Sequence, residues 1–409
     1  MSTHWFVVFR KCLISLHNWY VFRRTSPGKG SLVPRLGEGF LERWYYVMTI
    51  GIKAPGYYVQ GNGELDKLGK YVKKIGNSFL VLLSPNNKRR IGDRLDKALH
   101  SANKSVFYAE FQGECSKKAI ADVQDIAYQH GCDAIIGVGG GKALDTAKVV
   151  ATNLGDLPTI IIPTIASNDA PCSSVAVIYN EQGVVIKALM MKHNPDLVLV
   201  DTGIIAQAPK QYLVSGMGDA LSTYFEARAC QRSGAKTMAR GTCSATALAL
   251  AELCYKTLLN DSLEALSAVE NQEVNPALER VIEACVYLSG VGFESGGLAA
   301  AHAINDGFAH VPQAHGASHG EKVAFGLLAQ LILEKAPKDE WDTVFRYIKS
   351  VGLPSCLADL GIKDVKEEEI RMVAEAATVP TQFTKNVRAD ITADEVYDAI
   401  MKADTLGQS

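Results

Sequence analysis

Four of the chain's nine histidines lie in one stretch, AAAHAINDGFAHVPQAHGASHGEKVAFG, which runs from Ala299 to Gly326. An imidazole side chain can bind a transition metal, and it can also take up or release a proton near neutral pH. A single histidine is more often only solvated or hydrogen-bonded, so clustering and spacing must decide which of the four do chemistry. The stretch is therefore a candidate metal or acid–base site.

The elements around these histidines predict how they are positioned. The Ala-rich run around His302 is typical of a helix, whereas the proline and glycines between residues 312 and 320 predict a loop before an apolar run resumes at Val323. His302 and His319 are too far apart in sequence to share one helical face. A helix followed by a loop that turns back can nevertheless bring them together.

A glycine-rich turn supplies a second candidate site. In IIGVGGGKALDTAK, Gly139, Gly140 and Gly141 follow an apolar run and precede a helical one. Contiguous glycines let backbone amides approach a phosphate closely, and the helix N-terminus adds partial positive charge. The pattern is not GxGxxG, because the glycines are contiguous, and it is not a P-loop, because Ala143 follows Lys142. We expect the turn to hold phosphates, although a tight turn without a ligand fits the same residues.

A polar segment follows the next expected strand. The run PTIASNDAPCSSVAVIY, residues 163–179, lies at the carboxyl end of that strand, where ligands bind in open α/β sheets. Thr164, Ser167 and Ser173 offer hydroxyls to a ribose, phosphate or amide group, and Asp169 offers a carboxylate. For each hydroxyl a turn-capping hydrogen bond is an equally good explanation.

Hydrophobic patterning predicts two different halves of the chain. From Gly51 to about Asp201, short apolar runs alternate with amphipathic runs, which is typical of a parallel α/β layer. A hairpin is expected within this part, with its turn at residues 180–183. The rest of the chain carries long Ala- and Leu-rich runs and predicts an all-helical domain. The expected strands are SFLVLLS, SVFYAEF, DAIIGVGG and PTIIIPT, and the chain changes character after PDLVLVD.

Composition narrows the class of partner. With 42 basic and 44 acidic residues the net charge is −2, so nothing global points to nucleic acid or to a membrane surface, and we expect a small-molecule partner. The nine cysteines include no CxxC pair, which favours reduced thiols over a disulfide framework or a structural zinc site.

The first residues of the chain differ in composition from the rest. Basic and aromatic side chains are interspersed there, and no acidic residue precedes Glu38. Such a segment resembles a mitochondrial transit peptide, so we expect the mitochondrial matrix as the location. Arg10 and Lys11 interrupt the apolar run too early for a membrane span. If translation starts near Met48 instead, the expected location is cytoplasmic.

The family resemblance rests on five motifs in the expected order: VGGGKALDTAK, PTIASNDAPCS, GMGDALSTYFEARAC, SGVGFESGGLAAAHA and SHGEKVAFG. Together they closely resemble the glycerol dehydrogenases, a zinc-using branch of the iron-containing alcohol dehydrogenase superfamily. The resemblance covers roughly Ile52 to the C-terminus. It implies a dehydroquinate synthase-like fold with an N-terminal dinucleotide-binding α/β domain and a C-terminal helical domain. We therefore expect an NAD-binding α/β domain at 49–202 and a helical metal and substrate domain at 203–409, after the basic extension at 1–48. We also expect a homo-oligomer.

The resemblance also implies roles for individual residues. Asp219, His302 and His319 would hold one Zn²⁺, with Fe²⁺ as the alternative because the same ligand set binds it. Glycerol or another small vicinal diol would lie beside His302, His319 and Asp169, and NAD would take a hydride from C2 to leave dihydroxyacetone. The candidates for the catalytic proton transfer are Asp169, His315 and a metal-bound water. The implied NAD contacts are Gly139, Gly140, Gly141, Lys142, Asp145, Thr164, Ser167, Ser173, Val175 and Tyr179.

Some positions depart from the family pattern. Thr223 stands where iron-using members carry a histidine four residues after the ligand aspartate, and this favours a three-residue zinc site. Asn305 stands where glycerol enzymes often carry another histidine. Ser84–Asn87 replace an aspartate expected beside the adenosine ribose, and the cations Lys88–Arg90 follow, which would help to admit NADP. We expect NAD, with the three cations as a solvated helix start.

Two other classes of protein remain as alternatives. Dehydroquinate-synthase-like lyases share the fold, a bound NAD and a metal, but they act on an anionic sugar phosphate and would need clustered Lys and Arg in the helical domain. The motifs around Asp219 and Gly297–Ala303 are mostly small and neutral, which favours an uncharged polyol. A cofactor-binding protein without catalysis would have no need of all three metal ligands.

Overall fold

The computed structural model describes residues 49–111 and 113–409. The basic extension predicted at residues 1–48 lies outside the described residues, and so does its predicted role as a transit peptide. The remainder of the chain forms one compact unit. Among the described residues, no helix is both long enough and apolar enough to cross a membrane.

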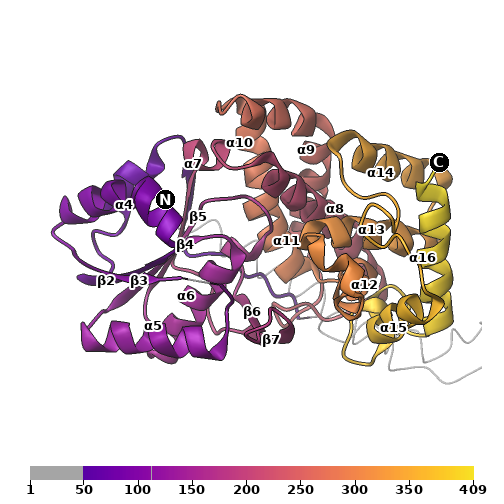
Figure 1. Ribbon diagram of the computed structural model, residues 1–409, viewed down its shortest axis with the longest axis horizontal. Helices are drawn as coiled ribbons and strands as arrows, with labels where there is room; N and C mark the ends of the chain where they lie inside the picture. The colour runs from indigo at the N-terminus through magenta and orange to yellow at the C-terminus, as the bar shows by residue number, and fades with distance from the viewer. Residues whose placement is uncertain (1–48, 112) are drawn as a thin grey trace, which may run out of the picture. The chain divides into compact units, whose positions relative to one another are not determined.

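A parallel sheet forms the centre of the first half of this unit (Figure 1). Its strand order is β1-β8-β5-β4-β2-β3, and each neighbouring pair is parallel. The strands are β1 (Tyr58–Gly61), β2 (Ser78–Leu83), β3 (Ser105–Glu110), β4 (Ala134–Gly139), β5 (Thr159–Pro163) and β8 (Leu197–Asp201). The predicted parallel α/β layer is therefore confirmed.

Helices cover both faces of the sheet, which explains why its central strands are almost continuously apolar. On one face, Phe79 and Val81 of β2 belong to a core shared with α3 (Leu68–Tyr71) and α4 (Pro85–His100). Leu80 and Leu82 point the other way, into a core shared with α5 (Lys117–Gln129) and α6 (Gly141–Asn153). The second core continues into the helical half, so the two halves are packed together.

Two short features flank the predicted strands. The hairpin of β6 (Val175–Tyr179) and β7 (Val185–Met190) is antiparallel, as predicted. Strand β1 was not predicted, because it is four residues long and the polar Gln60 and Gly61 fill half of it. It forms the edge of the sheet by pairing with β8, where Tyr58 lies opposite Val198.

Helices make up the second half of the described chain, as predicted. The α-helices are α7 (Thr202–Ala206), α8 (Lys210–Ser233), α9 (Ala245–Glu270), α10 (Pro276–Glu283), α11 (Ser289–Gly296), α12 (Ala300–Gly307), α13 (His319–Leu333), α14 (Lys338–Val351), α15 (Glu367–Thr378) and α16 (Ala393–Gly407). A π-helical turn, η3 (Ala284–Leu288), joins α10 to α11. Short 3-10 turns, η4 (Phe308–His310) and η5 (Pro312–Gly316), connect α12 to α13.

The expectation of a loop up to Val323 was wrong at its C-terminal end. Helix α13 already begins at His319, because Ser318 and Glu321 form a capping box that satisfies the backbone amides of its first turn. A glycine in a first turn does not prevent helix formation when the cap is this complete. As a result, His319 is held on a regular helix.

Glycines allow the helices of the second half to cross at very short range. A Cβ atom on Gly320 of α13 would overlap the Ser215 carbonyl oxygen of α8, and one on Gly218 would overlap the Gly320 carbonyl oxygen. On the other side of α13, a Cβ on Gly326 would lie 2.5 Å from the Ala301 carbonyl oxygen of α12. Helices α8, α12 and α13 therefore meet backbone to backbone.

Gly320→Ala is expected to lower the free energy of unfolding by about 3 kcal/mol, because the new methyl group has to push α8 and α13 apart. Urea unfolding of the full chain measures the change. Gly316→Ala is the matched control, since a Cβ at Gly316 meets no atom within 4 Å. Equal stability of the two variants would show that the crossing does not require glycine.

Candidate active site

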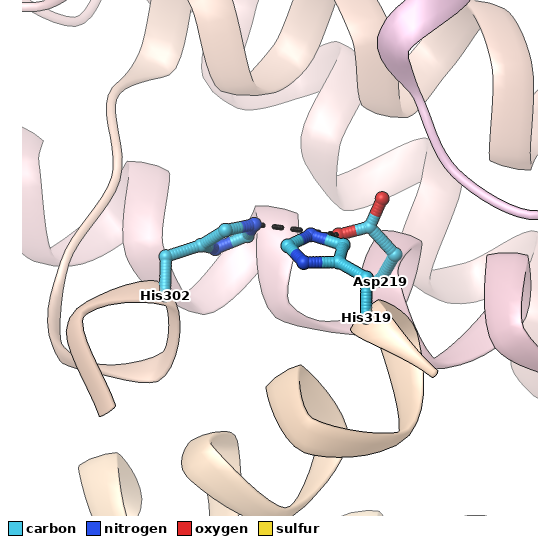
Figure 2. A group of neighbouring side chains, drawn as sticks. All are labelled: Asp219, His302 and His319. Carbon is cyan, nitrogen blue, oxygen red and sulfur yellow. Dashed lines mark ion pairs between the residues drawn. The ribbon is translucent and has the colours of Figure 1, made fainter. Parts of the chain in front are cut away.

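Three side chains from separate helices meet at the crossing of α8, α12 and α13. The Asp219 Oδ1 atom of α8 lies 3.3 Å from His302 Nε2 of α12 and 3.2 Å from His319 Nε2 of α13. Figure 2 shows the carboxylate and the two imidazole rings directed toward one another. One ligand atom from each residue lies within 4.8 Å of the other two, so a single metal ion can contact all three. The structure thus brings together the three predicted metal ligands.

The carboxylate of Asp219 is buried and only partly satisfied by the protein. Its side chain is 1% exposed, and Oδ1 has no hydrogen-bond partner among the described residues. The other oxygen, Oδ2, accepts a hydrogen bond from the Asp169 backbone amide at 3.2 Å. A buried charged oxygen without a donor is costly unless a cation compensates it. The site therefore has the donor set and the unpaired charge that suit a divalent ion.

Glu226 is a second buried carboxylate, which sequence reasoning did not identify. Its side chain is fully buried, and Oε2 lies 2.6 Å from His302 Nδ1. The sequence carries one signal for it, since seven residues, or about two helical turns, separate Glu226 from Asp219 on α8. Both carboxylates thus lie on one helical face, on opposite sides of the His302 ring.

The pKa shifts describe a site with excess negative charge. Burial works to lower the pKa of His302, but the Glu226 and Asp219 carboxylates outweigh it and raise that pKa well above its usual range. Burial likewise works to raise the pKa of Asp219, but His319 and His302 hold it below its usual range. Positive charge between the two carboxylates is therefore strongly favoured.

Asp169 lies beside this cluster at the C-terminal side of β5. Its Oδ2 accepts a hydrogen bond from Ser289 Oγ at 2.8 Å, and Ser289 Oγ is itself 2.8 Å from Thr223 Oγ1. Burial and the nearby Asp219 carboxylate raise the pKa of Asp169 well above its usual range. Thr223 occupies the position at which a further histidine ligand would be expected in an iron site. It helps to orient Asp169 through Ser289.

One cavity of about 730 Å³ connects the histidine cluster with the glycine-rich turn. Its walls include His302 and His319 at one end and the N-terminus of α6 at the other. Thr164, Asp219 and His315 are not among the lining residues. The predicted site residues that line it are Gly139, Gly140, Gly141, Lys142, Asp145, Ser167, Asp169, Ser173, Val175, Tyr179, His302 and His319.

The glycine-rich turn presents an uncapped helix N-terminus to this cavity. Gly140 is the N-cap residue of α6, and among the described residues no side chain caps the first amides of the helix. At Gly141 a Cβ atom would lie 2.8 Å from Asn168 Nδ2, so a larger residue would fill the turn. Lys142 adds an ammonium group 2.6 Å from Glu114 Oε1. Free amides, a helix dipole and a cation together can hold a phosphate group.

Other predicted cofactor contacts also have structural partners. Asp145 accepts a hydrogen bond from the Val177 amide at 2.9 Å and forms an ion pair with Lys148 at 2.8 Å, so it joins α6 to the hairpin. Thr164 Oγ1 lies 3.4 Å from Asn87 Nδ2, which is the donor. Asp145 and Thr164 thus belong to the protein's own hydrogen-bond network.

The segment that replaces the expected ribose-binding aspartate begins a helix. Ser84 caps α4 by accepting a hydrogen bond from the Asn87 amide, and both residues line the cavity. Lys88 forms an ion pair with Asp96 at 3.7 Å. Lys88, Arg89 and Arg90 are absent from the cavity lining.

His315, His310 and Asn305 are not members of the group formed by Asp219, His302 and His319. His315 Nε2 is 3.1 Å from the Ala309 carbonyl oxygen in the turns between α12 and α13. His310 is exposed on η4. Asn305 is buried and donates to Asp306 Oδ1 at 3.1 Å. Of the four histidines, His302 and His319 are the pair that the fold brings together.

Comparisons with known proteins agree with this arrangement. The family model for iron-containing alcohol dehydrogenase matches residues 55–202. The chain is 50% identical over 360 residues to glycerol dehydrogenase from Escherichia coli, a match that spans 87% of this chain and 97% of the relative. Over 361 residues it is 46% identical to glycerol dehydrogenase from Pseudomonas putida, covering 88% of this chain and 99% of the relative.

A solved structure extends the agreement to three dimensions. The crystal structure of glycerol dehydrogenase from Schizosaccharomyces pombe matches with a TM-score of 0.85 at 36% identity, covering 88% of this chain and 92% of that chain. These matches confirm the predicted family resemblance and fold. High identity over nearly the whole length of the relatives shows that the chain belongs to the iron-containing alcohol dehydrogenase family.

Proposed function

We propose that this protein oxidises glycerol to dihydroxyacetone, and catalyses the reverse reaction, with NAD as the hydride acceptor and one zinc ion per subunit. The observation that carries the proposal is a single cavity that joins a three-residue metal site to an uncapped helix N-terminus. The identities to glycerol dehydrogenases support glycerol as the substrate.

Asp219, His302 and His319 are the proposed metal ligands. Three protein ligands leave coordination positions open for a substrate, as catalytic zinc sites require. A bound zinc ion would act as a Lewis acid that lowers the pKa of an alcohol. The same ligand set also binds Fe²⁺. The proposal of zinc rests on Thr223, which supplies a hydroxyl to Ser289 where a fourth imidazole would otherwise lie.

Asp169 is proposed to orient the hydroxyls of the polyol and to accept a proton. Its carboxyl group lines the cavity beside His302 and His319, and Ser289 fixes one of its oxygens. The other oxygen is thus free to accept a hydrogen bond from a substrate. A carboxyl group within hydrogen-bond reach of the reacting hydroxyl can take part in general acid–base catalysis.

The charge of the cavity favours a neutral substrate over a sugar phosphate. Among the described residues that line it, Lys142 is the only lysine or arginine, and it belongs to the α/β half. Phe293 and Leu298 of the helical half contribute apolar walls to the cavity. This composition argues for a small polyol and against the lyase alternative.

NAD is the proposed cofactor because the glycine-rich turn suits its pyrophosphate. NAD supplies the hydride acceptor, and the protein holds the reacting carbon against it. The cations Lys88–Arg90, which would favour a 2′-phosphate, are absent from the cavity lining.

The full chain is expected to reduce NAD in the presence of glycerol, to lose this activity when its metal is removed, and to regain most of it with zinc. Asp219→Asn should lower turnover by more than about 100-fold. Mutating a residue that only hydrogen-bonds to a metal ligand already lowers metal affinity or activity roughly 10- to 100-fold, and Asp219 is itself a proposed ligand. Asp122→Asn is the control, since this exposed carboxylate pairs only with Lys118. NADP and Fe²⁺ are offered in parallel.

Three results would contradict parts of the proposal. The absence of glycerol-dependent reduction with either cofactor and either metal would refute the glycerol dehydrogenase function. Preference for NADP would refute the cofactor assignment, and restoration by Fe²⁺ but not by zinc would refute the metal assignment.

Asp169→Asn is expected to lower turnover by about 100-fold and to stabilise the metal-free protein near neutral pH. Because folding raises the pKa of Asp169, burying its ionised form costs stability. This cost is absent below the ordinary aspartate pKa of about 4 and grows as the pH rises toward the folded-state value. Urea unfolding across pH should therefore show the gain near neutrality and none in acid. Unchanged turnover would rule out the assigned role.

We also propose that residues 1–48 direct the protein to the mitochondrial matrix, as their basic, acid-poor composition suggests. A fluorescent reporter carrying these residues should enter mitochondria, and one carrying Arg10→Glu, Lys11→Glu and Arg23→Glu should not. Diffuse cytoplasmic signal from the unaltered segment would exclude the targeting role. The homo-oligomeric state stays a prediction.

A further inference from the structure

Glu226 is held by hydrogen bonds at both ends of its carboxylate. The Oε1 atom accepts from the Ala299 amide at 2.7 Å and from the His302 amide at 3.1 Å. The Oε2 atom lies 2.6 Å from His302 Nδ1 and accepts from Ser222 Oγ at 3.3 Å. Because the side chain is fully buried, no water competes for these contacts.

The contact between Glu226 and His302 fixes which ring nitrogen carries the proton. A carboxylate only accepts hydrogen bonds, so Nδ1 must be protonated beside Glu226 Oε2. In a neutral imidazole the other nitrogen, Nε2, then has a free lone pair. Nε2 is the atom that faces Asp219 Oδ1 at 3.3 Å. Glu226 therefore leaves the correct nitrogen available for a metal.

Glu226 also balances the charge of a divalent ion. Asp219 contributes one negative charge in direct contact with the proposed metal, and Glu226 contributes a second one across the His302 ring. Both carboxylates are almost completely buried. Two such charges neutralise one divalent ion in a region where unbalanced charge is costly.

We propose that Glu226 is a positioning residue that fixes the tautomer and orientation of His302 and thereby sets the metal affinity of the site. This inference rests on the metal centre of the proposed function. Residues that accept a hydrogen bond from the second ring nitrogen of a metal-ligating histidine typically contribute roughly 10- to 100-fold to metal affinity.

A purely structural role is the competing explanation, because Glu226 Oε1 also accepts the first amides of α12. The variant Glu226→Gln separates the two roles. Its amide oxygen can keep the hydrogen bonds from Ala299 and His302, which places its NH₂ group against His302 Nδ1. An NH₂ group donates, so Nδ1 has to become the acceptor and the proton moves to Nε2. Ser222 Oγ already has another acceptor in the Asp219 carbonyl oxygen, at 2.9 Å.

Zinc affinity of the full chain, measured by competition with a chromogenic chelator, should fall roughly 10- to 100-fold in Glu226→Gln. In a His302→Ala background the same substitution should cost less zinc affinity than in wild type, because the part of its effect that passes through His302 is absent. Glu294→Gln is the matched control: Glu294 is also fully buried, and it contacts Ser174 and Asn194 instead of a ligand. It should leave zinc affinity within about twofold of wild type.

Nitrogen-15 NMR of histidine-labelled protein supplies a readout that a structural role would not move. In the metal-free chain, at a pH high enough to leave the His302 ring neutral despite its raised pKa, the ring should carry its proton on Nδ1 in wild type and on Nε2 in Glu226→Gln. The His302→Ala chain identifies the signal by its absence.

Wild-type zinc affinity in Glu226→Gln would overturn the assignment of Glu226, and so would an equal loss of zinc affinity with and without His302. Both results leave the metal site of the proposed function intact. A wild-type chain that binds no zinc would overturn the assignment of Glu226 and would also remove the metal from the proposed function. The two failures are therefore distinguishable.

Discussion

The close crossing of α8 and α13 is the constraint on which the site depends. Gly218 and Gly320 let the two backbones touch. Asp219 follows Gly218 and His319 precedes Gly320, so the Asp219 Oδ1 and His319 Nε2 atoms come to lie 3.2 Å apart. A second short approach, at Gly326, draws α12 onto α13 and carries His302 toward the same point. The ligand geometry is thus a consequence of backbone packing, because the helices α8, α12 and α13, and not loops, hold the three ligands in place.

Once the helices are packed in this way, buried negative charge dominates the chemistry of the site. Asp219 lacks a donor on Oδ1, Glu226 lies behind His302, and Asp169 is forced toward its protonated form by burial and by Asp219. Each of these features is unfavourable for a folded protein without a cation, and each becomes favourable when a divalent ion lies between the side chains. The cavity then connects this point with the amides of α6, where an anionic cofactor is favoured instead.

Local patterns in the sequence were sufficient for most of the fold. The apolar runs of β2, β4 and β5 are long enough to predict buried strands. The motifs around Asp219, His302 and His319 identify the ligands through family resemblance. Strand β1 was missed because its sequence is short and half polar. It is stabilised by backbone pairing with β8, a distant segment that no local pattern reveals. Glu226 was missed because its partner lies on a different helix, and no local pattern reveals a contact between distant segments.

The central claim is that Asp219, His302 and His319 bind one zinc ion at the end of the cavity. The most direct measurement is anomalous X-ray scattering at the zinc edge from crystals of the zinc-loaded full chain. The account predicts one strong peak per subunit, about 2.0–2.2 Å from Asp219 Oδ1 and from the Nε2 atoms of both histidines. A peak bound to other side chains, or no peak at this cluster, would contradict it.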